Sequence, residues 1–184
     1  SGQVIPSLDA MVELANDGVQ VICTYPNNDA GGRAIISELE KLDHKNISGL
    51  QVHQSLGRYF YHGVLALAGN IKYQVACVGN SSSGIKETPV FGCPTINIGS
   101  RQEGRLRGKN VVDVDYVSAN IVAVVKKCFY DTEFRKQCKD TDNPYYLGDA
   151  GRKIADVLSA MPLGQKVIRK KMMLRGEAKD GWYQ

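Results

Sequence analysis

The sequence lacks the long apolar runs of a membrane protein. No stretch approaches the ~18 consecutive apolar residues that a helix needs to cross a bilayer. Residues 1–6 have neither a basic region nor an apolar core, so we expect that they are not a signal peptide. The 184 residues are 43% hydrophobic and 23% charged, which is typical of a soluble globular protein with one core. We therefore expect no membrane partner.

A strong charge imbalance is also absent. The formal net charge is only +4, and the one dense basic run lies at residues 166–175. Nucleic-acid-binding domains usually carry a concentrated basic stripe, and a membrane-surface helix needs an apolar face that this run has little of. We interpret residues 161–184 as a solvated basic C-terminal tail, and we expect no nucleic-acid partner.

Paired cysteines and metal-binding spacings are missing. The five cysteines are an odd number, no two have CxxC spacing, and the three histidines form no metal-binding pattern. Cys23 and Cys77 lie in apolar runs, where a free cysteine behaves as a small hydrophobic residue. This pattern favours reduced thiols, a cytoplasmic protein and no metal. Neither a P-loop nor a G-x-S-x-G motif is present, so a P-loop ATPase or a serine hydrolase has no support.

Apolar runs and amphipathic stretches do alternate along the chain. The run at 19–23 is continuously apolar, as in a parallel strand buried on both faces. Strand and helix alternate at least four times, which predicts a Rossmann-like, doubly wound parallel sheet within residues 1–160. Further strands are expected at 50–53, 75–78, 95–98 and 111–114, and helices around 8–15, 34–42, 59–67, 85–91, 121–128, 133–138 and 154–161.

Three polar loops follow expected strands, at 27–33, 79–84 and 99–105. Ligands of open α/β sheets bind at the carboxyl ends of the strands, so we expect these loops on one edge. A single serine before a helix usually only caps it. Three consecutive serines, Ser81 to Ser83, exceed what a cap needs. Their hydroxyls and the free backbone N–H groups at a helix start suit phosphate oxygens, with help from the helix dipole.

Two charged side chains near these loops suit the rest of a nucleotide. Glu87 lies one helical turn after Ser83, and a carboxylate there can accept two hydrogen bonds from a ribose diol; the alternative is a glutamate that only complements the helix dipole. Arg101 suits a bidentate phosphate contact. Taken alone, Arg101 is interpreted as a surface charge. Beside a serine loop, it becomes a candidate to bind a diphosphate. Arg105 is assigned no binding role.

Two long motifs resemble the UDP-N-acetylglucosamine 2-epimerase family. They are residues 78–87 (VGNSSSGIKE) and 91–105 (FGCPTINIGSRQEGR), and residues 25–31 (YPNNDAG) and 55–59 (SLGRY) look like further parts of the pattern. The resemblance covers residues 19–114 and is closest to the hydrolysing branch, which makes N-acetylmannosamine and UDP. The segment 65–75 is longer than the family's usual helix at this place.

The resemblance implies a two-domain GT-B-type enzyme of which this chain is the C-terminal half, starting just after that domain's first strand. It implies that no metal or redox cofactor is used. The family's catalytic carboxylates lie in the N-terminal domain, and a substrate-contacting histidine lies on the missing strand. The chain alone is therefore expected to be inactive. Its expected partners are a UDP-sugar and the missing N-terminal domain, in a homodimer or larger oligomer. The residues implied to contact UDP are Asn27, Ser81, Ser82, Glu87 and Arg101.

Two other functions share parts of this pattern. The donor-binding domain of a GT-B glycosyltransferase has the same architecture and also binds UDP-sugars. A non-catalytic nucleotide-sugar-binding module needs the same loops. Fold alone does not choose among these, and the joined motifs at 78–87 and 91–105 favour the epimerase.

Overall fold

The computed structural model describes residues 2–27, 31–146, 148–162, 164, 178–179 and 182–183. The chain divides into two compact units, Ser1–Tyr146 and Leu147–Gln184. The second unit contains helix α7 (Ala150–Ala160) and the short antiparallel strands β6 (Ala178–Lys179) and β7 (Trp182–Tyr183). Most of the expected basic tail, 161–184, lies outside the described residues.

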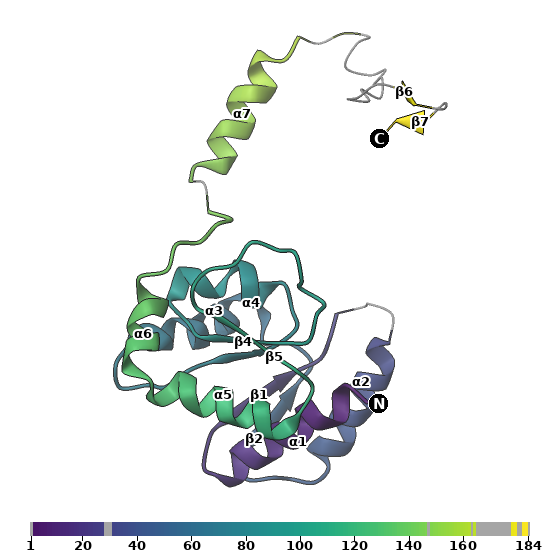
Figure 1. Cartoon of the computed structure of the whole chain (residues 1–184), viewed down its shortest axis with the longest axis vertical. Helices are drawn as coiled ribbons and strands as arrows, with labels where there is room; N and C mark the ends of the chain where they lie inside the picture. Colours follow the sequence, from purple (N-terminus) through teal and green to yellow (C-terminus); the bar gives the residue numbers. More distant parts are fainter. Residues whose placement is uncertain are drawn as a thin grey trace. The chain divides into compact units, whose positions relative to one another are not determined.

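The first unit alternates strands and helices, as predicted (Figure 1). The α/β class is confirmed. The strands expected at 50–53, 95–98 and 111–114 have those bounds, the other expected elements differ by a few residues, and the helix expected at 85–91 is divided into a short α-helix and a 3-10 helix. The elements are α1 (Val4–Asn16), β1 (Val21–Thr24), α2 (Gly32–Asp43), β2 (Leu50–His53), α3 (Gly57–Ala66), the 3-10 helix η1 (Leu67–Gly69), β3 (Cys77–Gly79), α4 (Ser83–Lys86), the 3-10 helix η2 (Thr88–Phe91), β4 (Thr95–Ile98), β5 (Val111–Val114), α5 (Ser118–Tyr130) and α6 (Thr132–Lys139).

The strands of this unit form two parallel sheets. One has the order β1-β2, and the other has the order β3-β4-β5. In the first sheet Val21 pairs with Leu50. In the second, Thr95 of the central strand pairs with Cys77 on one side and Val111 on the other. Parallel pairing confirms the predicted Rossmann-like arrangement. Helices connect the successive strands except β4 and β5, which a loop connects.

Helices cover both faces of the β3-β4-β5 sheet. Ile96 and Ile98 of β4 enter the main core together with buried residues of α1 and α5, two helices that pack side by side (Figure 1). Thr95 points to the other face, because successive residues of a strand alternate, and its hydroxyl donates to Thr88 of η2 at 2.7 Å. All four residues of β4 are buried.

Among the described residues, helices cover only one face of the β1-β2 sheet. Val21 and Leu50 join the main core beside Leu14 of α1 and Leu42 of α2. Ile22 points the other way and is 43% exposed. The prediction of a strand buried on both faces at 19–23 is therefore wrong for β1. Ile22 is exposed because α1 and α2 both pack on the side of Val21.

The polar loop expected at 27–33 connects β1 to α2 and includes the start of that helix. The helix begins after Gly31, whose φ is +89°, and no side chain caps it. Residues 28–30 of the expected loop lie outside the described residues. Glycine suits this position because the left-handed conformation is strained for other residues.

Candidate functional site

The serine loop, defined here as residues 79–84, connects β3 to α4. The Ser83 hydroxyl donates to Ser81 Oγ at 3.1 Å, and the Ser83 N–H approaches the same oxygen at 3.4 Å. Gly84 N–H donates to the Ser81 carbonyl at 3.2 Å, and Lys86 N–H donates to the Ser82 carbonyl at 3.0 Å. These bonds wind the loop into one compact turn, in which Ser81 is exposed and Ser82 is half-buried.

The helix after this loop is shorter than the sequence interpretation assumed. It contains only the four residues Ser83–Lys86, and the chain then enters η2, which has Pro89 in its first turn. Proline has no N–H to continue an α-helix, and it disfavours helical geometry at the residue before it. A helix macrodipole needs many aligned peptide units. The prediction that a helix dipole helps this loop to bind phosphate is therefore wrong for so short a helix. Hydroxyl and N–H groups of the loop remain as phosphate donors.

Glu87 contacts a residue that sequence reasoning missed. Its Oε2 atom lies 2.7 Å from Nε2 of His62, which belongs to α3. Toward an ionised carboxylate only the imidazole N–H can donate. The His62 ring also lies beside Phe91, with 5.2 Å between ring centroids. No local spacing indicates this pair, because packing of α3 onto the segment after α4 brings the two residues together.

Tyr61, the neighbour of His62, contacts the serine loop itself. Its hydroxyl donates to Ser83 Oγ at 3.0 Å. Burial, followed by the nearby Cys77 thiol, raises the pKa of Tyr61 well above its usual range. The phenol therefore stays protonated and can keep donating at any physiological pH.

The loop at 99–105 is hydrogen-bonded to the serine loop. Arg101 Nη1 donates to the carbonyl of Asn80 at 3.0 Å, and Gln102 Nε2 donates to the same carbonyl at 2.7 Å. Arg101 is exposed, whereas Gln102 is buried. The structure thus brings Arg101 next to the serines, as expected for neighbouring strand ends. The sequence interpretation overlooked Gln102 because glutamine there reads as an ordinary loop residue.

A second set of bonds fixes the base of the same loop. Asn97 Nδ2 donates to Asp113 Oδ1 at 2.7 Å and to the Gly99 carbonyl at 3.2 Å. Arg107 donates to the other oxygen of Asp113 and, at 2.9 Å, to the Gln102 carbonyl. The hydrogen bond from Arg107 lowers the pKa of Asp113. The loop is therefore held at its start, middle and end.

Asn27 lies apart from these contacts. It follows β1, is exposed, and makes no hydrogen bond that joins it to the serine loop within the described part of the chain. The structure groups Ser81, Ser82, Glu87 and Arg101 around the ends of β3 and β4. Asn27 follows a strand of the other sheet.

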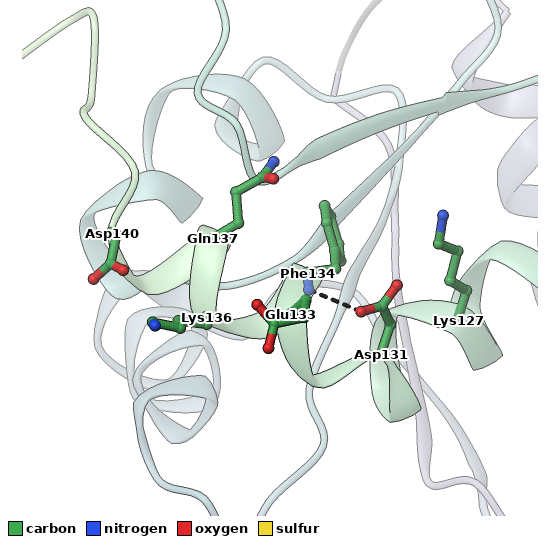
Figure 2. Close-up of a pocket in the computed structure, with 7 residues that line it drawn as sticks. All are labelled: Lys127, Asp131, Glu133, Phe134, Lys136, Gln137 and Asp140. Carbon is green, nitrogen blue, oxygen red and sulfur yellow. Dashed lines mark hydrogen bonds between the residues drawn. The ribbon is translucent and has the colours of Figure 1, made fainter.

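A surface pocket lies on α5 and α6, away from the loop edge (Figure 2). Its charged lining consists of Lys127, Asp131, Glu133, Lys136 and Asp140, so groups of both signs line it. Asp131 in this pocket accepts from Phe134 N–H at 2.9 Å, which caps the start of α6. Helix capping and surface solvation account for these groups.

The five cysteines are free thiols. Burial raises the pKa of Cys23 and of Cys128 to about 11 each and that of Cys138 to about 12, so these thiols stay protonated. Among the described residues, no three His, Cys, Asp or Glu side chains cluster as metal ligands. None of the helices in the described ranges combines the length and the hydropathy that crossing a membrane requires.

Comparison with known families identifies the relationship. The model of the family described as UDP-N-acetylglucosamine 2-epimerase matches residues 3–159. The chain belongs to the UDP-N-acetylglucosamine 2-epimerase family. Membership confirms the resemblance carried by the two long motifs, and it does not favour the glycosyltransferase alternative.

Curated relatives give the same relationship. The chain is 32% identical over 146 residues to the UDP-N-acetylglucosamine 2-epimerase of Neisseria meningitidis serogroup B, covering 79% of this chain and 36% of the relative. It is 40% identical over 93 residues to the GDP/UDP-N,N'-diacetylbacillosamine 2-epimerase (hydrolyzing) of Campylobacter jejuni, covering 50% and 23%. It is 41% identical over 80 residues to the polysialic acid biosynthesis protein P7 of Escherichia coli, covering 44% and 20%. The aligned part is well under half of each relative's length.

Proposed function

We propose that this chain binds the UDP moiety of a nucleotide sugar, as the C-terminal domain of a hydrolysing UDP-N-acetylglucosamine 2-epimerase. The observation that supports this most is the grouping of Ser81, Ser82, Glu87 and Arg101 at the ends of β3 and β4. Hydroxyl donors and a guanidinium suit a diphosphate, and a carboxylate suits the ribose diol. Asn27 is the fifth proposed ligand, from the end of β1.

The proposed reaction begins with elimination of UDP and of the C2 proton from UDP-N-acetylglucosamine, which leaves a glycal. Water then adds across the C1–C2 double bond with inverted configuration at C2, which gives N-acetylmannosamine. Negative charge grows on UDP as its bond to C1 breaks. Ser81, Ser82 and Arg101 would stabilise that charge, because preformed donors act most strongly where charge develops. Glu87 would fix the ribose and supply binding energy remote from the reacting bond.

The proton transfers of this reaction need an acid and a base. We assign these to an N-terminal domain of the same protein, in a cytoplasmic homodimer or larger assembly that uses no cofactor. This follows from the family's division of labour, and it agrees with the short share of each relative that the chain aligns with. The chain alone is then a binding domain without turnover.

Isothermal titration of the purified chain with UDP tests the binding proposal. We expect weak binding, which Arg101→Ala weakens and Arg101→Lys restores only in part, since an ammonium cannot make the bidentate contact. Arg105→Ala is the matched control, because Arg105 lies in the same loop and is also exposed. Absence of heat at millimolar UDP from a chain that melts cooperatively would contradict the proposal. An Arg101→Ala variant that only lowers the melting temperature would show that Arg101 anchors the loop and does not bind phosphate.

Incubation with UDP-N-acetylglucosamine and no acceptor tests the reaction. The full-length protein should release N-acetylmannosamine, whereas a glycosyltransferase or a non-catalytic module should not. The present chain alone should release none. Product from the chain alone would disprove the assignment of the acid and base to another domain.

A further inference from the structure

Two adjacent side chains of α3 contact both halves of the proposed nucleotide site. Tyr61 donates to Ser83 in the serine loop at 3.0 Å, and His62 contacts Glu87 at 2.7 Å. The loop and the glutamate follow β3, whereas both partners belong to a helix that precedes it. One turn of α3 therefore determines where the phosphate-binding and ribose-binding groups lie relative to each other.

The geometry of His62 suits a positioning role. Its side chain is 35% exposed, and its ring lies near the rings of Tyr61 and Phe91, with centroid distances of 5.8 and 5.2 Å. Contacts with two neighbouring rings restrict the orientations of the His62 ring and therefore the position of its Nε2 atom. The contact therefore limits the freedom of Glu87, a long side chain that loses considerable rotamer entropy when it is ordered.

Glu87 keeps room for a ligand while His62 holds it. The contact uses Oε2, and a carboxylate has about four lone-pair sites on its two oxygens. The Glu87 side chain is 42% exposed, so a hydroxyl from solvent can reach it. The carboxylate can thus accept from His62 and from a ribose diol at the same time.

We propose that His62 is a positioning residue for ribose recognition, which orders the Glu87 carboxylate before the nucleotide arrives. This inference rests on the proposed UDP site. Ordering a side chain before binding removes that cost from the binding step. Loss of the contact should therefore weaken binding only of nucleotides that have a ribose diol.

Titration with UDP and with 2′,3′-dideoxy-UDP isolates this effect, because the second probe lacks both hydroxyls. His62→Phe is the informative variant, since it keeps an aromatic ring beside Phe91 but cannot donate. We expect it to weaken UDP binding on the order of 3–10-fold, the cost of ordering one flexible side chain, and to leave dideoxy-UDP binding unchanged. His62→Gln, whose amide can donate, should recover part of the loss. His53→Ala is the matched control, because His53 contacts Gln51 in the β1-β2 sheet at 3.2 Å.

A Glu87→Ala background completes the test. If His62 acts through Glu87, His62→Phe should cause no further loss of UDP affinity there. Additive losses, or equal weakening of both probes by His62→Phe, would overturn the inference and leave the UDP site standing. Wild-type chain that melts cooperatively but binds neither probe would instead defeat the proposed function, and the inference with it. Melting curves of each variant identify any change that arises from unfolding.

Discussion

The β3-β4-β5 sheet and the β1-β2 sheet differ in a way that their sequences do not suggest. The central strand β4 reads TINI and carries two polar residues, yet Thr95 and Asn97 are only 2% and 1% exposed. The strand β1 reads VICT and is more apolar, yet Ile22 is 43% exposed. Burial here follows the helices that cover each strand. The Thr95 hydroxyl and the Asn97 amide nitrogen tolerate burial because they are hydrogen-bonded, whereas Asn97 Oδ1 has no partner among the described residues.

The same difference extends to the loops that follow the strands. The loops after β3 and β4 are joined through the Asn80 carbonyl, and α3 contacts the first of these loops through Tyr61 and contacts Glu87 through His62. Asn27 after β1 has no such bond among the described residues. We infer that the half of the proposed site at the ends of β3 and β4 is preformed by these tertiary bonds.

A glycine pair gives the largest expected difference between the regions. Gly99 ends β4 with φ +72°, and a Cβ there would collide with the Tyr116 ring; Gly18 precedes β1 with φ +86° and open space around it. Gly99→Ala should destabilise the fold by about 2–5 kcal/mol, from backbone strain plus overpacking. Gly18→Ala should cost only the strain, about 1–2 kcal/mol. Urea unfolding measures both, and equal costs would show that the end of β4 is no more tightly packed than the start of β1.

Two Thr→Val substitutions, one in each region, compare the same chemical change at a buried and at an exposed position. The Thr88 hydroxyl donates to Gly84 O at 2.7 Å and accepts from Thr95 and Asn110, at 2.7 and 3.0 Å. Thr88→Val keeps the shape and leaves these buried groups unpaired, which should cost about 1–3 kcal/mol. Thr24→Val on the exposed face of β1 should change stability by less than about 0.5 kcal/mol. A Thr88→Val chain as stable as wild type would mean that this hydrogen-bonded network does not hold the serine loop.

The smallest expected effect depends on pH and concerns Asp113. Its pKa is lowered mainly by the hydrogen bond from Arg107. A depressed pKa adds stability above the pKa of the unfolded state, and that stability is lost as pH falls through the folded-state value. Because the Asp113 side chain is 60% exposed, Asp113→Asn should cost at most about 1 kcal/mol at pH 7.

Unfolding at a series of pH values checks this prediction. The difference between wild type and Asp113→Asn should shrink below about pH 4, near the ordinary value for aspartate. In an Arg107→Ala background the substitution should cost less, since the main cause of the shift is gone. A difference that stays constant from pH 7 to pH 3 would contradict the assigned role of the Arg107 bond.

Local signals predicted much of the fold and part of the site. The strand at 95–98 was located to the residue, because a segment rich in β-branched residues lies there between Pro94 and Gly99. The short length of α4 was predictable from Pro89, and the sequence interpretation overlooked it. The exposure of Ile22 was not predictable, because it depends on which side α1 and α2 pack. The pairing of His62 with Glu87 likewise needs the packing of separate elements, which no spacing along the chain records.

The Asn80 carbonyl accepts hydrogen bonds from two side chains, so two separate bonds join the loops. A carbonyl oxygen has two lone pairs, and here Arg101 and Gln102 approach it together. If Arg101 turns to a phosphate, the buried Gln102 still donates to the Asn80 carbonyl and joins the two loops. A ligand can therefore bind the exposed Arg101 side chain while the two loops stay joined through Asn80. Gln102 joins the two loops, and Arg101 is available to a ligand. A substitution at one of these residues can therefore leave the role of the other in place.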